Sequence, residues 1–487
     1  MRPAHDVATV RAAEAALMAA VPEGELMQRA ATGLMRTCAG MLRSERGGVY
    51  GSRVCLLVGA GNNGGDALFA GALLQRRGAQ VTAVLLSDAA HPRGLLALRR
   101  AGGAVVPSSS DRADAAVQDA DVVVDGIVGI GGRGGLQVRA AELAEAATNG
   151  GGLVVAVDLP SGVDADTGAV PGDAVWADVT VTFGTLKPGL TVTPGVLRAG
   201  LLEVVDIGLD PYLPEPVVEL LDLGDVARLV PRPHPLDHKY TQGVVGVAAG
   251  SAAFPGAAVL TVGGALHARP GLVRYAGPVA PAVVQAWPSA VVCSDLPSLA
   301  GRAQAWSVGP GIGLDGAARS LVDDALRQPV PLVLDADALT LLSDVLATAP
   351  DRLRQRGAAT VLTPHEGEFA RLAPDLDPAA DRLDAVRLLA ERTGATVLLK
   401  GFTTVIASPD GRTRVNPTGT RWLATGGTGD VLTGVLGAYL AAGLDPLDAA
   451  SAAAFVHGLA GRLAAADGPP TSRDVVTALP GAFVALG

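Results

Sequence analysis

The sequence predicts an α/β protein made of two different α/β units. Short β-branched runs alternate with alanine-rich helical stretches along the 487 residues, and one proline-rich segment interrupts this alternation. That segment, DPYLPEP at residues 210–216, has three prolines and no apolar period, which is typical of a linker. We therefore expect one domain over residues 1–212 and a second over 213–487. Because no fixed-period repeat relates them, a fusion is favoured over a duplication.

The first half is expected to begin with two helices, Val7–Ala20 and Glu25–Arg43. β-Branched runs then mark the strands, because such side chains fit a pleated, buried surface. The expected strands are Val54–Val58, Gln80–Leu86, Asp121–Asp125, Leu153–Asp158, Val179–Phe183 and 201–208. Their alternation with helical stretches predicts a parallel sheet that has helices on both faces.

The second half starts a new α/β pattern after the linker. Its strands are expected within GVVGVAAGS (243–251), QAWSVGPGIG (304–313), VPLVLDADAL (330–339), ATVLTPHEGE (359–368) and ATVLLKGFTTVIAS (395–408). The last segment, from Ala424 onward, predicts two consecutive helices introduced by a glycine loop.

The composition limits the classes of partner. A net charge of −10 without a basic stripe argues against nucleic acid, and no apolar stretch approaches the ~20 residues of a membrane span. The three cysteines are few and widely spaced, and Cys55 is interpreted as a small buried apolar residue, so a reducing cytoplasm fits best. The N-terminus also lacks the pattern of a signal peptide. We expect a cytoplasmic homo-oligomer that acts on small molecules.

Residues 53–71, RVCLLVGAGNNGGDALFAG, contain a G-x-G-x-x-G pattern between a strand and a helix. This pattern is typical of dinucleotide-binding crossovers, in which a pyrophosphate lies on a helix N-terminus. Asp88 follows the next apolar run, where a dehydrogenase would have a ribose-binding carboxylate. However, Asn62, Asn63 and Asp66 are not required by the glycine pattern, and they speak against a dehydrogenase.

Three strands of the first half end in polar, glycine-rich loops, at residues 59–66, 125–135 and 158–168. Ligands of open α/β sheets bind beyond the carboxyl ends of the strands, so these loops are expected to form one crevice. Their side chains offer mostly oxygen atoms, which suit a hard cation or hydrogen bonds to an amide and a sugar. The alternative is that these residues only form turns, and Arg133 is either a phosphate ligand or a solvated side chain.

The motifs GAGNNGGD, DGIVGIGGRGG, DLPSG and FGTLKPG occur in this order. With them, nearly all of residues 1–210 resembles the NAD(P)H-hydrate epimerase domain, which implies a Rossmann-like three-layer fold. The resemblance implies that Asn63, Asp125 and Ser161 bind a potassium ion, and that Asp158 binds the substrate and is the acid/base. It also implies that the nucleotide site is lined by Asn62, Asn63, Gly64, Gly65, Asp66, Gly129, Ile130, Gly131, Gly132, Arg133, Gly134 and Gly135. One departure is Ala67, where the family usually has glycine, and its single extra methyl is not expected to remove the chemistry.

The strongest single signal is ATGGTGDVLTG, at residues 424–434. Gly426, Gly427 and Gly429 precede an apolar helix, so free N–H groups and the helix dipole predict an anion site. Asp430, in the first helical turn, is either a helix-stabilising acid or a base that takes the proton of an acceptor hydroxyl. The G-K-[ST] of a Walker A loop is absent.

This glycine–aspartate segment resembles that of the ribokinase-like superfamily, in which it provides both the anion hole and the base. The motifs HKYTQGVVGVAAGS, FPGAAVLT, GPGIG, LDADAL, TPHEGEF, LKGFTTVI and GGTGDVLTG follow one another over residues 238–436. In this order they resemble the ADP-dependent NAD(P)H-hydrate dehydratase, which implies a hydrated-nucleotide site at Ala257, Gly311, His365 and Asp430. The adenine nucleotide is implied at Lys400, Gly401, Phe402, Thr403, Thr404 and Gly429, with Mg²⁺ as the metal and ADP as the phosphoryl donor.

Other polar residues of the second half keep two interpretations. His365, after Thr-Pro at a strand end, is either a substrate ligand or a satisfied loop histidine. Asp335 and Asp337 either serve Mg²⁺ or cap the next helix. His457 lies within an apolar helical pattern and is interpreted as structural.

Together the resemblances imply a bifunctional repair enzyme for hydrated NADH and NADPH, written NADHX and NADPHX. One domain would epimerise the R and S forms, and the other would dehydrate the S form to NAD(P)H while ADP is converted to AMP and phosphate. The alternative is a small-molecule kinase of the ribokinase-like superfamily, acting on a vitamin precursor and fused to a non-catalytic Rossmann-like binding domain. Such a kinase would accumulate a phosphorylated product, which the repair enzyme would not.

Overall fold

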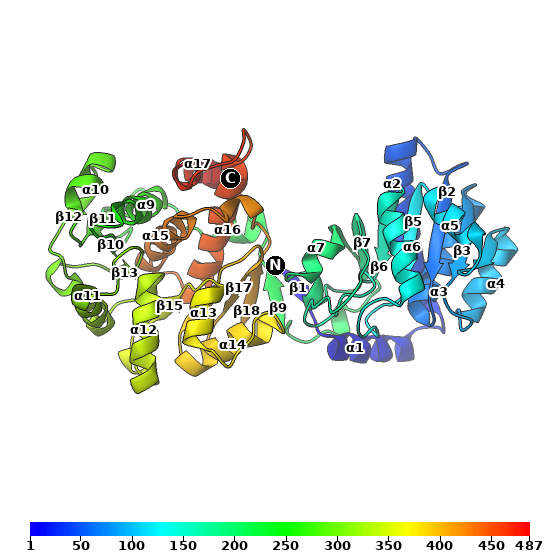
Figure 1. Ribbon diagram of the computed structural model, residues 1–487, viewed down its shortest axis with the longest axis horizontal. Coiled ribbons are helices and arrows are strands. Elements are labelled where there is room, and N and C mark those ends of the chain that lie inside the picture. Colours follow the sequence, from blue (N-terminus) through cyan, green and yellow to red (C-terminus); the bar gives the residue numbers. More distant parts are fainter. The chain divides into compact units, whose positions relative to one another are not determined.

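The computed structural model describes residues 1–487 and contains two compact units. Pro3–Val217 form the N-terminal unit, and Val218–Gly487 together with Met1–Arg2 form the C-terminal unit (Figure 1). Each unit has its own sheet, so each carries its own set of strand ends.

The N-terminal unit is built on a seven-stranded sheet in which every strand pair is parallel. The strand order is β4-β3-β2-β5-β6-β7-β8, so the direction of winding reverses between β2 and β5. A crevice beyond the strand ends is expected at such a reversal. The strands are β2 (Arg53–Val58), β3 (Gln80–Leu85), β4 (Ala104–Pro107), β5 (Val122–Gly126), β6 (Leu153–Val157), β7 (Val179–Phe183) and β8 (Leu201–Val205).

Helices cover both faces of this sheet, as predicted. Alternate residues of β2 point to opposite faces: Leu56 packs among side chains of α2, α3 and α4, whereas Leu57 packs among those of α5 and α6. The helices are α1 (Val7–Ala20), α2 (Glu25–Arg46), α3 (Asn62–Arg76), α4 (Pro92–Ala101), α5 (Asp111–Gln118), α6 (Val138–Asn149) and α7 (Gly195–Ala199).

The C-terminal unit contains an eleven-stranded sheet of order β1-β9-β18-β17-β16-β15-β14-β13-β10-β11-β12. Pairing is parallel from β12 to β16 and antiparallel on both sides of β17. The segment 395–408, expected as one strand, therefore forms a hairpin, because the chain reverses at residues 400–403. The strands are β1 (Arg2–Ala4), β9 (Val218–Leu220), β10 (Val244–Ala248), β11 (Leu272–Tyr275), β12 (Val291–Val292), β13 (Ala305–Val308), β14 (Leu332–Leu334), β15 (Thr360–Leu362), β16 (Thr396–Leu399), β17 (Thr404–Ala407) and β18 (Thr413–Asn416).

Helices lie on both faces of this sheet as well (Figure 1). α9, α15, α16 and α17 share one large apolar core with the sheet. The two helices expected after Ala424 are α15 and α16. The helices are α8 (Leu223–Leu229), α9 (Pro255–His267), α10 (Ala280–Ala286), α11 (Gly316–Arg327), α12 (Asp337–Thr348), α13 (Glu366–Leu372), α14 (Arg382–Thr393), α15 (Thr428–Ala441), α16 (Pro446–Ala464) and α17 (Ser472–Ala485).

None of these helices combines the length and the apolar character that a membrane span requires. All three cysteines are free, and burial raises the pKa of Cys38 and of Cys55 to about 12. The interpretation of Cys55 as a small buried apolar residue is confirmed, since its side chain lies in the core beneath α5 and α6.

α9 and α15 approach each other so closely that each helix needs a glycine at the contact. A Cβ atom on Gly264 of α9 would lie 2.3 Å from the carbonyl oxygen of Val431 in α15. Conversely, a Cβ atom on Gly434 of α15 would lie 2.0 Å from the carbonyl oxygen of Thr261 in α9. This backbone contact fixes the first turns of α15, which carry Asp430.

We expect Gly264→Ala to lower the free energy of unfolding of the C-terminal unit, because the new methyl meets a backbone oxygen that cannot rotate away. Overpacking of this kind costs about 1–3 kcal/mol, more than the 0.5–1 kcal/mol that alanine gains over glycine in a helix. Gly256→Ala in the same helix is the matched control, since its methyl would meet nothing within 4 Å. Calorimetric melting of the full chain measures both effects, and equal melting temperatures for the two variants would contradict the expectation.

Candidate active sites

The polar loops of the N-terminal unit meet at one edge of its sheet. β2, β5, β6 and β7 are neighbouring parallel strands, so their carboxyl ends lie side by side. Asp125 lies within β5 beside Leu57 of β2, and Asp158 follows β6 directly. The structure therefore brings residues from three separate loops into one region, as the sequence predicted.

Asp125 and Ser161 form a buried polar cluster between β5 and β6. The Asp125 carboxylate accepts hydrogen bonds from the Ser161 amide at 2.8 Å and from the Ile127 amide at 3.2 Å, and the Ser161 hydroxyl lies 2.7 Å away. Burial raises the pKa of Asp125 to about 6, although these hydrogen bonds act to lower it. No lysine or arginine pairs with this carboxylate, so a cation beside it would compensate a buried charge.

Asn63, in the first turn of α3, lies next to the same loop. A Cβ atom on Gly129 would lie 2.9 Å from the Asn63 side-chain oxygen, so glycine is required for this close approach. The Asn63 side-chain nitrogen is buried and has no hydrogen-bond partner. The uncompensated Asp125 carboxylate leaves room for a small ligand with a positive charge, which the Asn63 side-chain oxygen could contact, whereas the Asn63 nitrogen is a donor that needs an acceptor.

Asp158 is held by a buried lysine that sequence reasoning missed. Lys187, which follows β7, places its Nζ atom 2.5 Å from Asp158 Oδ1 and 2.9 Å from the Thr182 hydroxyl. The side chain of Lys187 is 1% exposed. Asp158 has a φ of 68°, an unusual value for a residue other than glycine, and such strain is typical of functional sites. The only sequence signal for Lys187 was its place within the FGTLKPG motif.

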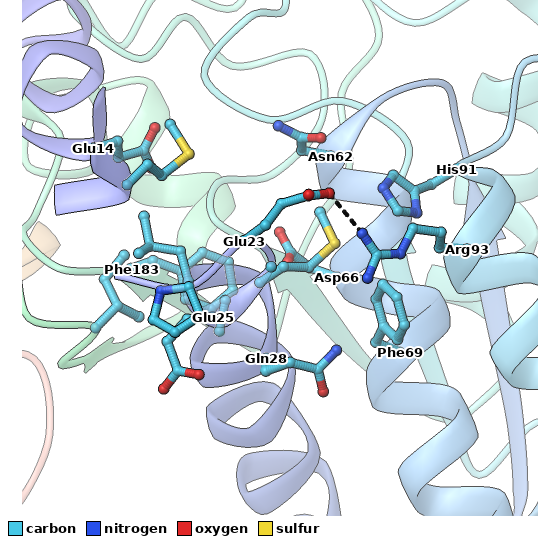
Figure 2. Close-up of a pocket in the computed structure, with 17 residues that line it drawn as sticks. Glu14, Glu23, Glu25, Gln28, Asn62, Asp66, Phe69, His91, Arg93 and Phe183 are labelled. Carbon is cyan, nitrogen blue, oxygen red and sulfur yellow. Dashed lines mark hydrogen bonds and ion pairs between the residues drawn. The ribbon is translucent and has the colours of Figure 1, made fainter. Parts of the chain in front are cut away.

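A cavity of about 470 Å³ opens between α1, α2, α3 and α4 (Figure 2). Asn62 and Asp66 from α3 line it, together with Glu14 of α1 and the ring of Phe183 at the end of β7. Burial, with the nearby charge of Asp158, raises the pKa of both Asp66 and Glu14. The charge of Asp158 therefore acts on this cavity, although Asp158 does not line it, and we call it the acidic cavity.

The second glycine-rich loop lines a different cavity, of about 450 Å³. Its wall contains Gly129 and Gly132–Gly135 together with Ser87 and Ser108 at the ends of β3 and β4. Arg133 lines it too, but its guanidinium is 78% exposed and pairs with Asp164 at 3.1 Å. The residues assigned to one nucleotide site by resemblance thus line two cavities, on either side of the loop after β2.

The remaining predicted residues of this unit serve close packing. A Cβ atom on Gly64 would lie 2.5 Å from the Gly59 carbonyl oxygen, and one on Gly126 would lie 2.6 Å from the Ala67 methyl. Gly65 is packed against His91, and Ile130 contributes to the apolar core. Gly131 lies near the Arg11 guanidinium. Asp88 lies in an exposed turn after β3, as expected if it has no ribose to bind.

In the C-terminal unit the glycine loop leads into α15, with Asp430 in its first turn. Gly427 has a φ of 88°, and Gly429 is the second residue of the helix. N–H groups in the first turn of a helix lack partners within the helix, so those of α15 are available to an anion at the glycine loop. Burial and the negative charge of Asp335 raise the pKa of Asp430 to about 7, while Lys400 acts to lower it. A carboxyl group that titrates near neutral pH can act as a base under ordinary conditions.

Lys400 lies near Asp335, Gly429 and Glu368 in this site. Its Nζ atom lies 2.6 Å from Asp335 Oδ1, at the end of β14, and 3.4 Å from where a Cβ atom of Gly429 would be. The other Asp335 oxygen accepts a hydrogen bond from the Thr433 hydroxyl at 2.6 Å. Burial acts to lower the pKa of Lys400, but the charges of Asp335 and Glu368 outweigh it and the pKa is raised.

His365 and Glu368 form a capping box at the start of α13. The Nδ1 atom of His365 accepts hydrogen bonds from the amides of Gly367 and Glu368, and the Glu368 carboxylate accepts one from the His365 amide. The imidazole is 56% exposed, and Glu368 Oε2 lies 3.7 Å from Lys400 Nζ. His365 is therefore a helix cap whose Nε2 atom lies 3.3 Å from Glu368 Oε1, and both of its interpretations stay open.

Ala257 and Gly311 come together although they lie 54 positions apart in the sequence. A Cβ atom on Gly311, whose φ is 64°, would lie 2.8 Å from the Ala257 methyl. Two residues further on, the Gly313 amide donates to Asp337 Oδ2 at 2.8 Å. Asp337 thus ties the GPGIG loop to the start of α12, and its charge also acts on Asp430.

The predicted adenine-nucleotide segment, Lys400–Thr404, forms the turn between β16 and β17. Arg382 of α14 supports it, because its guanidinium donates to the Lys400 carbonyl at 2.9 Å. The Phe402 ring is 43% exposed, whereas Thr403 and Thr404 are buried. An exposed aromatic ring beside the lysine offers a surface on which a base can stack.

His457, interpreted as structural, lies buried in α16 below the glycine loop. Burial lowers its pKa to about 4, with a backbone hydrogen bond at Thr428 acting in the opposite direction. Its Nε2 atom has no hydrogen-bond partner. The neutral ring therefore packs against the start of α15, which agrees with the structural interpretation.

Comparisons with known proteins agree with this two-part organisation. The family described as YjeF-related protein N-terminus matches residues 23–189, and the family described as NAD(P)H-hydrate dehydratase matches residues 245–478. Of the solved structures, the ADP/ATP-dependent NAD(P)H-hydrate dehydratase from Bacillus subtilis, co-crystallised with ATP/Mg²⁺, is 30% identical with a TM-score of 0.50. It covers 55% of this chain and 98% of its own.

The predicted α/β fold with a ribokinase-like second unit is confirmed. A ribokinase-like superfamily protein from Enterococcus faecalis has a TM-score of 0.50 at 24% identity, and it covers 56% of this chain and 97% of its own.

Whole-chain relatives cover both units. The bifunctional NAD(P)H-hydrate repair enzyme Nnr of Mycobacterium leprae is 49% identical over 478 residues, which are 98% of this chain and 97% of that protein. The protein of the same name from Mycobacterium tuberculosis is 50% identical over 452 residues, which are 93% of this chain and 92% of that protein. The chain therefore belongs to the family of bifunctional NAD(P)H-hydrate repair enzymes.

Proposed function

We propose that this chain repairs hydrated NADH and NADPH in two steps, one in each unit. The N-terminal unit interconverts the R and S forms, and the C-terminal unit dehydrates the S form at the expense of ADP. The observation that carries the proposal is the position of Asp430, in the first turn of α15 beside Gly429 and Lys400, in a chain of this family.

The dehydration needs a good leaving group, and phosphoryl transfer supplies one. Asp430 takes the proton of the ring hydroxyl. The hydroxyl oxygen bonds to the terminal phosphorus of ADP, and AMP leaves. The N–H groups of the glycine loop and the Lys400 ammonium stabilise the charge on the phosphoryl oxygens. The ring nitrogen then expels phosphate, and loss of a neighbouring ring proton restores the dihydronicotinamide.

The nucleotide is expected along residues 400–404, with its phosphates toward Gly429. No group of three or more His, Cys, Asp or Glu side chains is placed to hold a metal ion. Mg²⁺ keeps several waters and binds mostly through nucleotide phosphates, so it would arrive with ADP. Its contribution when bound is to neutralise phosphate charge.

The epimerisation requires protons to move at the hydrated ring carbon without any hydride transfer. Asp158 is the acid/base of this step, and the buried Lys187 side chain, whose Nζ atom lies 2.5 Å from its carboxylate, holds it in position. Lys187 is thus a positioning residue for Asp158.

A potassium ion fits the cluster of Asn63, Asp125 and Ser161, because the donors are oxygen atoms and the buried Asp125 charge lacks a partner. Bound there, the ion would hold the ends of β2, β5 and β6 at fixed positions. The cavity of about 450 Å³ that is lined by the second glycine-rich loop, Ser87 and Ser108 suits the phosphates of the dinucleotide.

The whole proposal is tested by mixing both epimers of NADHX with the chain, ADP and Mg²⁺, and following the absorbance of reduced nicotinamide. Complete conversion is expected, because the R form is continually turned into the S form. Recovery that stops near half would mean that the N-terminal unit does not epimerise. Accumulation of a phosphorylated product without recovery would favour a kinase and overturn the proposal.

Two isosteric substitutions separate the two activities. Asp430→Asn should stop NADH recovery while epimer exchange, followed by NMR, continues at the wild-type rate. Asp158→Asn should slow epimer exchange by about 10²–10⁴-fold, the usual contribution of a general acid or base, and leave dehydration of the S form unchanged. Loss of both activities in either variant would contradict the assignment of one step to each unit.

The rate of dehydration should rise with pH through about 7, because Asp430 must lose its proton to act as a base and its pKa is raised to about 7. Below that pH the rate should fall about tenfold per pH unit. Asp337→Asn removes one of the negative charges that raise this pKa, so its acid limb should move to lower pH. A profile that is flat from pH 5.5 to 8.5 in the wild-type chain would exclude Asp430 as the base.

Potassium should accelerate epimer exchange and raise the melting temperature of the N-terminal unit as its concentration increases, since it binds only the folded state. Asp125→Asn should abolish both responses, because the amide cannot balance the ion's charge. Tetramethylammonium chloride at equal ionic strength is the control salt. An equal response to both salts would argue against a specific ion site.

A further inference from the structure

The acidic cavity contains a carboxyl group that the proposed chemistry has not used. Asp66 is 8% exposed, and no hydrogen bond or ion pair reaches its carboxylate. It nevertheless lines the acidic cavity, where Figure 2 shows it between Glu14 and Arg93. A mostly buried carboxyl group that has no partner in the protein and opens onto a cavity is placed to contact a ligand bound there.

Two of the cations around Asp66, Lys187 and Arg93, are already paired with other carboxylates. Lys187 pairs with Asp158, and Arg93 pairs with Glu23 at 2.8 Å, as the dashed line in Figure 2 marks. The Nδ1 atom of His91 accepts a hydrogen bond from the Gly94 amide, and burial lowers the pKa of His91. The charged and titratable groups around Asp66 are Arg11 and Glu14 from α1, Glu23 and Glu25 at the start of α2, His91 and Arg93 at the start of α4, and Asp158 and Lys187 at the ends of β6 and β7.

The balance of these groups disfavours a second negative charge at this place. Burial, then the charge of Asp158, then that of Glu14 raise the pKa of Asp66 well above its usual value. Asp158 itself accepts hydrogen bonds from Lys187 and from the Thr182 hydroxyl. The two aspartates therefore differ: Asp158 is paired with the Lys187 ammonium, whereas Asp66 has no such partner and its raised pKa favours the protonated form.

We propose that Asp66 is the catalytic acid of the epimerisation: a neutral carboxylic acid that protonates the ring hydroxyl while Asp158 acts as the base. This inference rests on the proposed epimerase function and assigns it a second reacting group. A pair of carboxyls in opposite protonation states is what acid–base chemistry at one carbon needs.

The proposed step balances as follows. Asp66 gives its proton to the ring hydroxyl, the carbon–oxygen bond breaks, water leaves, and the lone pair of the ring nitrogen forms a carbon–nitrogen double bond. A water molecule then adds to the other face of the same carbon and returns the electron pair to nitrogen. Asp158 takes the proton of this water, and its transfer to the Asp66 carboxylate restores the starting state. One water leaves and one enters, so the products differ from the substrates only in configuration.

Asp66→Asn should slow epimer exchange by about 10²–10⁴-fold, because the amide has the shape of the acid but cannot give a proton. The melting temperature should not fall, since the amide is as neutral as the acid it replaces. Asp66→Glu should restore part of the rate. Asp119→Asn, which alters an exposed carboxylate paired with Arg53 at 3.4 Å, is the control and should exchange the epimers at the wild-type rate.

Two further measurements detect the role of the proton directly. Wild-type exchange should decline as the pH rises through the raised pKa of Asp66, and Asp66→Glu should shift the pH at which the rate declines. Infrared difference spectra of wild type against Asp66→Asn at pH 7 should show the band of a protonated carboxyl group. Exchange in H₂¹⁸O should place ¹⁸O on the ring carbon at the rate of epimerisation.

The outcomes distinguish this inference from the function on which it rests. If the wild-type chain does not exchange the epimers, the proposed function fails and the role of Asp66 fails with it. If the wild-type chain exchanges them and Asp66→Asn stays within threefold of its rate, only the role of Asp66 is overturned. An infrared spectrum of an ionised Asp66 at pH 7 would overturn that role as well.

Discussion

Each unit of this chain has several carboxyl groups near the ends of its parallel strands and only one lysine among them. Both sites depend on this excess of carboxyl groups over positive charges. Lys187 lies 2.5 Å from Asp158, and Lys400 lies 2.6 Å from Asp335. In each unit a neighbouring carboxyl, Asp66 or Asp430, lacks an ion-pair partner and has a raised pKa. In each unit a carboxylate paired with lysine therefore lies near an unpaired carboxyl group whose pKa is raised, although the two units share neither fold nor strand order.

Much of the fold could be predicted from the sequence, because long periodic stretches dominate it. Val7–Ala20 and Val179–Phe183 begin and end as predicted, since in both the apolar pattern stops at a change in chain direction. The short strands β4, β11 and β18 were missed. Each has only four residues, and such runs carry too few side chains to establish a period. The hairpin of β16 and β17 was read as one strand, because its turn interrupts the apolar run only briefly.

The proximity of site residues could be predicted where they follow neighbouring parallel strands. Asp125 and Ser161 meet because β5 and β6 are neighbours, and any residues that end neighbouring parallel strands must lie close together. Lys187 escaped prediction, since a single lysine after a strand has the same appearance whether it is buried or solvated. The division of the loop residues between two cavities was not predicted either, because it depends on the side of the sheet toward which each loop turns.

The reciprocal glycines of α9 and α15 have a consequence for how this chain can change over evolutionary time. At Gly264 and Gly434 an added methyl would meet the backbone of the other helix rather than a side chain. A clash between side chains can be relieved when the partner residue is replaced by a smaller one, but every residue has the same backbone carbonyl group. A smaller side chain in the partner helix therefore cannot relieve the clash at either position, and each glycine must be kept independently of the other's side-chain neighbours.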